Sequence, residues 1–391
     1  MSSFSEYWDL DPEIVHLNHG SFGAAPKRVL AVQSELRARM ERNAMRFFLG
    51  DLEGLLDEAR AVLGSFIRAE PHDLVFVPNA TTGVNAVLRS LDFRQGDELL
   101  TTDHEYNACK NVLDHAAAKA GASVVVAKVP FPLASEDQVV EAIVAATTAK
   151  TRLLLVDHIT SPTGLVFPIA RIAAEMAARN VQVLVDGAHA PGMVDLSLEA
   201  LSPHVSFYTA NCHKWLCSPK GAAFLWVRRD RQNEIRPHVI SHGANVPRQD
   251  RSRFVLEFDW PGTLDFTPAL CIPASIAFLR DVCPTWRERN RALALEARKI
   301  LCDALGVPAP APESMIGSLA ALPIADAKKA HPFNLAFNDP LQEELFRERG
   351  FEVPIFSWPA SPKRVLRVSA QLYNTRDEYV HLASVLREKL S

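Results

Sequence analysis

Short apolar runs alternate with helix-like patterns over much of the chain, and this alternation limits the folds that are open to it. The runs end in polar residues and lie at 73–78, 97–102, 123–129, 151–157, 181–186, 206–211 and 222–227. Patterns with the 3.6-residue period of an amphipathic helix lie beside or between them, at 53–67, 107–120, 135–146 and 169–179. Strands that alternate with helices in this way predict an α/β fold with a mainly parallel sheet, covered by helices on both faces.

The length of the chain sets the expected domain organisation. Its 391 residues, of which 48% are hydrophobic and 23% charged, have an ordinary globular composition and are enough for two domains. We expect a large α/β domain over residues 15–280. A smaller α+β domain is expected to combine residues 1–14 and 281–391, with a helix at 286–305 and a final helix at 375–390.

Composition also limits the expected partners. The net charge is −4 and no basic cluster dominates, so neither nucleic acid nor an anionic membrane is an expected partner. The N-terminus lacks the basic and apolar regions of a signal peptide, and no apolar run reaches about 18 residues, which favours the cytoplasm. The six cysteines lack paired metal-ligand spacing, so we expect buried thiols rather than disulfides or a metal site.

The stretch from Ser206 to Gly221 gives the first indication of chemistry. Lys214 stands between two apolar runs, although lysine is almost never buried without a partner. Asp186 ends an earlier apolar run, and open α/β sheets place ligand-binding groups at the carboxyl ends of their strands. A lysine with a carboxylate across a planar ligand is what pyridoxal phosphate requires, because the lysine forms a Schiff base and the acid pairs with the pyridinium nitrogen. Lys214 and Asp186 are therefore candidate catalytic residues, with a surface turn lysine as the simpler alternative.

A second candidate site lies where the run 73–78 meets a helix pattern. The small and hydroxyl-bearing residues Ala80, Thr81 and Thr82 occupy this turn. A helix N-terminus offers free N–H groups and a favourable dipole to an anion. A plain N-cap by Thr81 or Thr82 is the structural alternative. Beside Asp186 and Lys214, the turn is better interpreted as a phosphate cradle.

Both motifs around these residues resemble one known family. Val185-Asp186-Gly187-Ala188-His189 and His213-Lys214-Trp215 are similar to motifs of the class V aminotransferase family of fold-type I pyridoxal phosphate enzymes, which includes cysteine desulfurases, kynureninase and isopenicillin N epimerase. The resemblance runs from about Leu17 to the C-terminus. It implies the fold-type I architecture, with a seven-stranded, mainly parallel sheet between helices and a smaller C-terminal α+β domain. It also implies pyridoxal 5'-phosphate as the cofactor.

The resemblance further implies which residues surround the cofactor. Thr81 falls on the phosphate-binding threonine, and Ala80 supplies backbone only. His104 falls on the histidine that stacks on the cofactor ring, with Tyr106 as the alternative. The other implied contacts are those of His189 with the phenolic oxygen, of Asn211 and His213 with the phosphate, and of Thr263 with the phosphate of a neighbouring subunit. The last contact implies a homodimer with a shared active site.

Arg367 is the main candidate for substrate binding. It lies in an apolar run before a polar turn, and a buried arginine requires an anion. Its motif resembles that of the family arginine that holds the substrate α-carboxylate, with an internal salt bridge as the alternative. Ser161 stands where the family has asparagine, so its role stays open. The Gly-rich segment that holds Asn18 and Gly20 lines the substrate side of the pocket in the resembling family.

The positions of the cysteines bear on the expected reaction. All six lie before residue 303, whereas the resembling desulfurases carry a nucleophilic cysteine in the small domain. The residues at 16–23 and 103–107 look most like the isopenicillin N epimerase branch. We therefore expect an enzyme that forms an external aldimine with an amino acid, removes its α-proton, and acts as an epimerase, racemase or C–S lyase. The alternatives are an aminotransferase, a desulfurase-like enzyme or a non-catalytic pyridoxal phosphate-binding protein.

Overall fold

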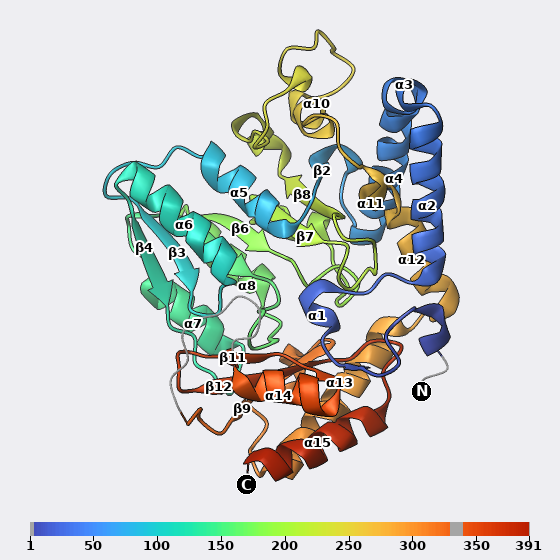
Figure 1. The fold of residues 1–391 in the computed structure, drawn as a ribbon. Coiled ribbons are helices and arrows are strands. Elements are labelled where there is room, and N and C mark those ends of the chain that lie inside the picture. The colour runs from blue at the N-terminus through green and yellow to red at the C-terminus, as the bar shows by residue number, and fades with distance from the viewer. Residues whose placement is uncertain (1–3, 329–338, 391) are drawn as a thin grey trace.

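A seven-stranded sheet forms the centre of the computed structural model, which describes residues 4–328 and 339–390 (Figure 1). The strand order is β2-β8-β7-β6-β5-β3-β4, and β8 alone runs against the other six. The bounds are β2 Leu74–Val77, β3 Glu98–Thr102, β4 Ser123–Ala127, β5 Thr151–Asp157, β6 Gln182–Asp186, β7 Phe207–Asn211 and β8 Ala223–Val227. The expected mainly parallel sheet is therefore confirmed.

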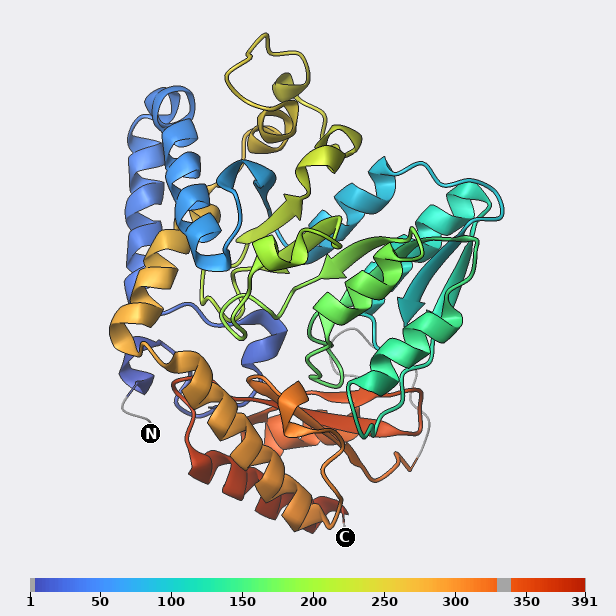
Figure 2. The same cartoon turned by 180° about the vertical axis from the view of Figure 1, so that it is seen from behind.

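Helices cover both faces of this sheet, as Figures 1 and 2 show from opposite sides. Successive residues of β5 explain why: Leu153 and Leu155 pack with apolar residues of α5, α6 and α10, while Leu154 and Val156 pack with α7, α8 and α12. A strand that is buried on both faces must be apolar throughout, and this produces the continuous runs of the sequence.

The helices have the following bounds: α1 His19–Phe22, α2 Lys27–Arg42, α3 Ala44–Arg46, α4 Leu52–Ile67, α5 Ala80–Ser90, α6 Asn107–Ala120, α7 Asp137–Ala146, α8 Ile169–Ala177, α9 Leu198–Leu201, α10 Arg253–Asp259, α11 Thr267–Leu270, α12 Ile272–Val282, α13 Trp286–Leu305, α14 Pro340–Arg349 and α15 Arg376–Leu390. Residues 267–282 form two helices, α11 and α12, rather than one. Pro273 lies in the first turn of α12, where its missing N–H costs no hydrogen bond, so a new helix begins there. Among the described residues, no helix is both long and apolar enough to pass through a bilayer.

A second, smaller sheet lies beside the large one (Figure 1). Its three antiparallel strands follow the order β11 (Ile355–Ser357), β12 (Arg364–Ser369) and β9 (Leu319–Ile324). The N-terminal segment joins this part of the molecule, because β1 (Val15–His16) pairs with β10 (Phe351–Glu352). The same segment also reaches β12, because the Leu17 carbonyl accepts from the N–H of Ser369, and residues that follow it contact Arg367. The expected domain boundaries remain a prediction.

Close packing of α5 against β7 fixes the start of α5. A Cβ atom at Gly83 would lie 2.0 Å from Thr209 Oγ1, whose hydroxyl donates to the carbonyl of Phe224. We expect Gly83→Ala to lower the free energy of unfolding by about 1–3 kcal/mol, because α5 must move away from the sheet. Urea denaturation measures this change. The matched control is Gly54→Ala in α4, where the added methyl meets nothing within 4 Å and should raise stability by about 0.5–1 kcal/mol. A neutral Gly83→Ala would contradict the tight contact.

Candidate active site

The carboxyl ends of β5, β6 and β7 and the start of α5 face one cavity of about 860 Å³. Ten residues that the sequence singled out line it: Ala80, Thr81, Thr82, Tyr106, Ser161, Asp186, His189, Asn211, His213 and Lys214. Parallel strands produce this convergence, since their polar ends meet at one edge of the sheet. Residues from turns far apart in the chain therefore form a single site.

Lys214 lies in the cavity and loses its proton more readily than an exposed lysine does. Burial and, second to it, the positive charge of the nearby Arg367 lower the pKa of its ammonium group to about 8. The ring of His189 shows where the protons lie. The indole N–H of Trp215, which can only donate, points at His189 Nδ1 at 3.3 Å, so the remaining ring proton sits on Nε2. Nε2 lies 3.2 Å from Lys214 Nζ and donates to it when the amine is neutral.

The backbone of Lys214 is also held in place. His19 Nε2 lies 3.0 Å from the Lys214 carbonyl, while His19 Nδ1 contacts the Tyr373 hydroxyl at 2.9 Å. Gly23 allows the first segment of the chain to approach, because a Cβ there would lie 2.0 Å from the carbonyl oxygen of His213. The N-terminal segment thus fixes the position of the lysine turn.

Asp186 ends β6 and is almost fully buried. Its Oδ1 accepts from the backbone N–H of Ala188 at 2.9 Å, and its Oδ2 accepts from the thiol of Cys109 at 3.1 Å. Burial raises the pKa of this carboxyl, whereas both hydrogen bonds and the charge of Lys214 oppose the rise. A buried carboxylate that faces the same cavity as Lys214 is suited to a protonated ring nitrogen.

The N-terminus of α5 provides an anion site at the other end of the cavity. Asn79 caps the helix by accepting from the N–H and the hydroxyl of Thr82, and Asn211 Oδ1 accepts from the N–H of Ala80 at 2.8 Å. Within the described part of the chain, the hydroxyl of Thr81 has no such partner. Thr81 therefore keeps a donor for a phosphate, while Asn211 positions the helix that presents it.

Arg367 lies behind the cavity wall as a fully buried cation. Its guanidinium donates to Ser161 O at 2.6 Å, to Ser21 Oγ at 3.0 Å and to Asn18 Oδ1 at 3.2 Å. Its Nε is buried with no acceptor, and no carboxylate pairs with it, in the regions that the structure describes. Burial lowers the pKa of Arg367 to about 10. A buried cation held only by neutral groups is suited to an anionic ligand, since an unpaired charge is costly.

The other two residues expected on the substrate side hold Arg367 and its surroundings. Asn18 bridges Arg367 and Glu352, because its amide donates to Glu352 Oε1 at 3.3 Å. Gly20 donates its N–H to Ser369 Oγ, and a Cβ there would lie 2.8 Å from the side chain of Leu319. Neither residue is part of the cavity wall, whereas Ser21, which the sequence reasoning missed, is.

His104 lies outside the cavity, contrary to the role expected for it. Its ring is fully buried and packs against Trp358, with ring centroids 4.6 Å apart. Both ring nitrogens are engaged, Nδ1 with Thr163 Oγ1 at 2.7 Å and Nε2 with Val129 O at 3.0 Å. Tyr106, the alternative, lines the cavity and is the better candidate for a stacking ring. Thr263 lies in an exposed loop and is not part of the cavity lining of its own chain, so its expected role at a neighbouring subunit stays a prediction.

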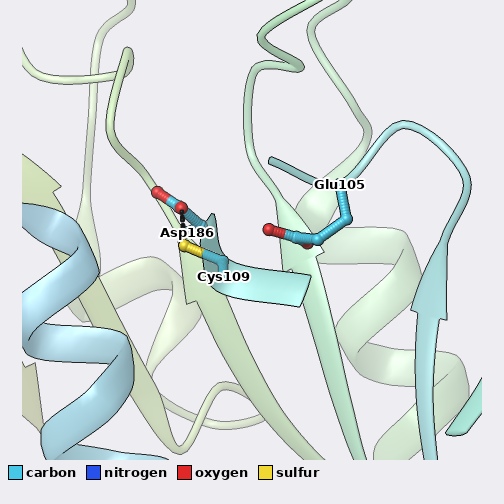
Figure 3. A group of neighbouring side chains, drawn as sticks. All are labelled: Glu105, Cys109 and Asp186. Carbon is cyan, nitrogen blue, oxygen red and sulfur yellow. Dashed lines mark hydrogen bonds between the residues drawn. The ribbon is translucent and has the colours of Figure 1, made fainter. Parts of the chain in front are cut away.

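Three further buried groups surround Asp186 and were not foreseen. Glu105, Cys109 and Asp186 place their oxygen and sulfur atoms within 4.8 Å of one another (Figure 3). Asp157 lies next to Asp186 because it ends β5 in register with the end of β6. The sequence held a signal for Asp157, since its apolar run ends in an acid as that of Asp186 does.

These residues fit pyridoxal phosphate. The cavity offers an amine in Lys214, a carboxylate in Asp186 for the ring nitrogen, a ring N–H in His189 for the phenolic oxygen, and a helix N-terminus with Thr81 for the phosphate. The four groups come from different turns and face one volume, which is what one ligand with an aldehyde, a pyridine and a phosphate requires.

Comparisons with known proteins agree with this chemistry. The family model for class V aminotransferases matches residues 23–254. Isopenicillin N epimerase of Amycolatopsis lactamdurans is 34% identical over 98% of this chain and 97% of its own length. A probable chloroplastic L-cysteine desulfhydrase of Arabidopsis thaliana is 28% identical over 98% of this chain and 84% of its own length.

One solved enzyme is similar in structure over almost its whole length. The cystine C–S lyase C-DES, in complex with its product cysteine persulfide, matches with a TM-score of 0.79 at 21% identity, over 96% of this chain and 98% of its own. A mutant of the same lyase carries glycine covalently linked to its pyridoxal phosphate and matches with a TM-score of 0.78 at 20% identity, over 96% and 97%. At this level of identity, the likeness shows the fold.

Proposed function

The chain belongs to the class V aminotransferase family, and on that premise we propose that this pyridoxal phosphate-dependent enzyme removes the α-proton of an amino acid and acts as an epimerase or a C–S lyase. The observation that carries the proposal is the pairing of Lys214 and Asp186 in one cavity with Arg367 close behind its wall. The cavity brings together a base and a partner for the ring nitrogen, and a buried cation for the substrate carboxylate lies behind its wall.

Each residue has a defined task in this proposal. When bound, pyridoxal phosphate supplies the electron sink that stabilises negative charge at the substrate α-carbon. Asp186 holds a proton at the ring nitrogen, and His189 donates from Nε2 to the phenolic oxygen. Lys214 accepts the α-proton at Nζ, a role suited to an amine whose pKa is lowered to about 8 by burial. Arg367 binds the α-carboxylate and so fixes which bond at the α-carbon faces Lys214.

The relatives support two outcomes after proton removal. Return of the proton to the opposite face gives epimerisation, the activity named for the Amycolatopsis lactamdurans relative. Expulsion of a sulfur substituent from the β-carbon gives lyase activity, as named for the Arabidopsis thaliana desulfhydrase. Desulfuration through a protein persulfide is less well supported, because all six cysteines are buried and none lies beyond residue 302.

We also propose a homodimer that completes the site. Thr263 sits in an exposed loop, next to exposed Leu264, while Val239 and Ile240 are exposed on a neighbouring loop. Exposed apolar side chains beside the loop that carries a candidate phosphate ligand support a contact with a second subunit.

An exchange experiment distinguishes the outcomes. The cofactor-loaded protein is mixed in heavy water with L- and D-amino acids, including sulfur-bearing ones, and the products are followed by NMR. We expect exchange of the α-hydrogen, accompanied by inversion for an epimerase or by loss of the β-substituent and formation of pyruvate for a lyase. A keto acid that appears only when an amino acceptor is supplied would instead indicate an aminotransferase. Absence of exchange with every amino acid would contradict the proposal.

A further inference from the structure

Buried acidic groups crowd around Asp186 in a way that the proposed mechanism does not use. Glu105 and Asp157 are both almost inaccessible to solvent, and Cys109 is fully buried. Figure 3 shows the Glu105 carboxyl and the Cys109 thiol directed toward Asp186 from the loop after β3 and from α6. The thiol proton is donated to Asp186 Oδ2, with a sulfur–oxygen distance of 3.1 Å.

Two oxygen atoms of these buried carboxyl groups accept no hydrogen bond from the residues that the structure describes. Glu105 Oε1 and Asp157 Oδ2 are buried, and neither finds a donor elsewhere among the described residues. If both carboxyls were ionised, each of these buried oxygens would be a charged acceptor without a donor, which is costly. A proton on each carboxyl removes this cost, because the group is then neutral and carries a hydrogen-bond donor of its own.

Charge leads to the same protonation state. Two carboxylates within 4.8 Å of each other in a buried site do not both ionise readily. Burial and then the neighbouring acids raise the pKa of Glu105 and of Asp157 well above their ordinary values. Asp186 is raised less, because the Cys109 thiol, the Ala188 N–H and Lys214 favour its ionised form. The other titratable groups near the cluster are Tyr106 and Tyr208, whose pKa values are raised by burial.

We propose that Cys109, Glu105 and Asp157 are positioning residues for Asp186: the thiol anchors its carboxylate, while the two other carboxyls remain protonated, so that the cluster carries its negative charge on Asp186. This inference rests on the proposed role of Asp186 at the ring nitrogen. In this proposal, the neighbouring side chains determine how the Asp186 carboxylate is oriented and why it is the ionised member of the cluster.

Single variants of the full-length protein test this assignment through cofactor binding. The measurements are the dissociation constant of pyridoxal phosphate, the pH midpoint of the absorbance of the bound cofactor, and the melting temperature. We expect Cys109→Ala to weaken cofactor binding about tenfold and to shift the pH midpoint, since a hydrogen bond to a charged group is lost. Cys109→Ser keeps a donor and should return binding to within about threefold of the parent. Cys271→Ala removes an equally buried thiol elsewhere and should change neither quantity.

The carboxyl variants test the protonation state. Glu105→Gln and Asp157→Asn replace an acid by a neutral group of similar shape, so each should leave cofactor affinity within about threefold of the parent. A larger change in either variant, with an unchanged melting temperature, would mean that the residue is an anion and would overturn the proposal. Unchanged binding by Cys109→Ala would overturn it as well. Cys109→Ser and the two carboxyl variants keep the test open if Cys109→Ala does not fold.

Asp186→Asn separates this inference from the proposed function. We expect it to weaken cofactor binding at least about tenfold, because a charge-assisted hydrogen bond is lost. Parental affinity in Asp186→Asn would remove Asp186 from the site and the proposed chemistry with it. Weak binding by Asp186→Asn together with parental binding by Cys109→Ala would overturn only the role of the surrounding groups.

Discussion

Lys214→Ala is expected to lower turnover of the amino acid substrate by at least about 10²–10⁴-fold, the usual contribution of a positioned acid–base group. The side chain lies on a loop between β7 and β8, and the fold depends on its backbone carbonyl, which His19 contacts, more than on its amine. The melting temperature should therefore stay close to that of the parent. The decisive measurement is the rate of α-hydrogen exchange in heavy water, which reports proton removal whatever the final product.

Lys214→Arg is the matched variant for this prediction. It keeps a positive charge in the cavity, but a guanidinium does not give up its proton at neutral pH and so is unable to act as the base. Exchange should be lost in Lys214→Arg as well as in Lys214→Ala. If either variant exchanged the α-hydrogen at the parental rate, another group would have to remove the proton.

The sequence was sufficient to locate Lys214 and Asp186 because, in a parallel sheet, the position of each residue can be predicted from the residues next to it in the chain. Each residue follows its own apolar run, and the carboxyl ends of parallel strands meet at one edge of the sheet. The same reasoning extends to Asp157, which ends β5 opposite Asp186. The apolar run 151–157 predicts a strand there, and its final acid predicts a polar group at the same edge of the sheet. Positions at strand ends were therefore predictable, within the part of the sheet that is parallel.

The positions that failed depend on contacts between distant segments. His104 lies two residues beyond the end of β3, where the direction of a side chain is set by its neighbours rather than by the strand. Those neighbours are Thr163 and Trp358, and the indole of Trp358 also reaches the carbonyl of Asp103, 255 positions away. No pattern in the residues around His104 predicts such a contact. The contact of the Cys109 thiol with Asp186 could not be predicted either. A helix pattern indicates that Cys109 is buried but does not indicate which residue it faces.

Arg367→Ala is expected to weaken binding of α-amino acids by about 2–5 kcal/mol, since the substrate carboxylate would lose its buried charged partner. Ser21, Asn18 and Ser161 already hold the guanidinium, so the cation is oriented before any ligand arrives. Those neutral acceptors do not cancel its charge. The variant itself should fold, because in the described regions of the chain Arg367 donates to neutral acceptors, and its loss leaves no carboxylate without a cation.

Two comparisons show whether the lost affinity belongs to the carboxylate. Decarboxylated amines of the same side chains should bind to the parent and to Arg367→Ala equally well, because they lack the group that Arg367 recognises. Arg367→Lys keeps the charge but loses the planar fork that pairs with both carboxylate oxygens, so its affinity should lie between those of the parent and the alanine variant. If the parent bound amino acids no better than the corresponding amines, Arg367 would be structural, and the hydrogen bonds to Ser161, Ser21 and Asn18 would be its whole function.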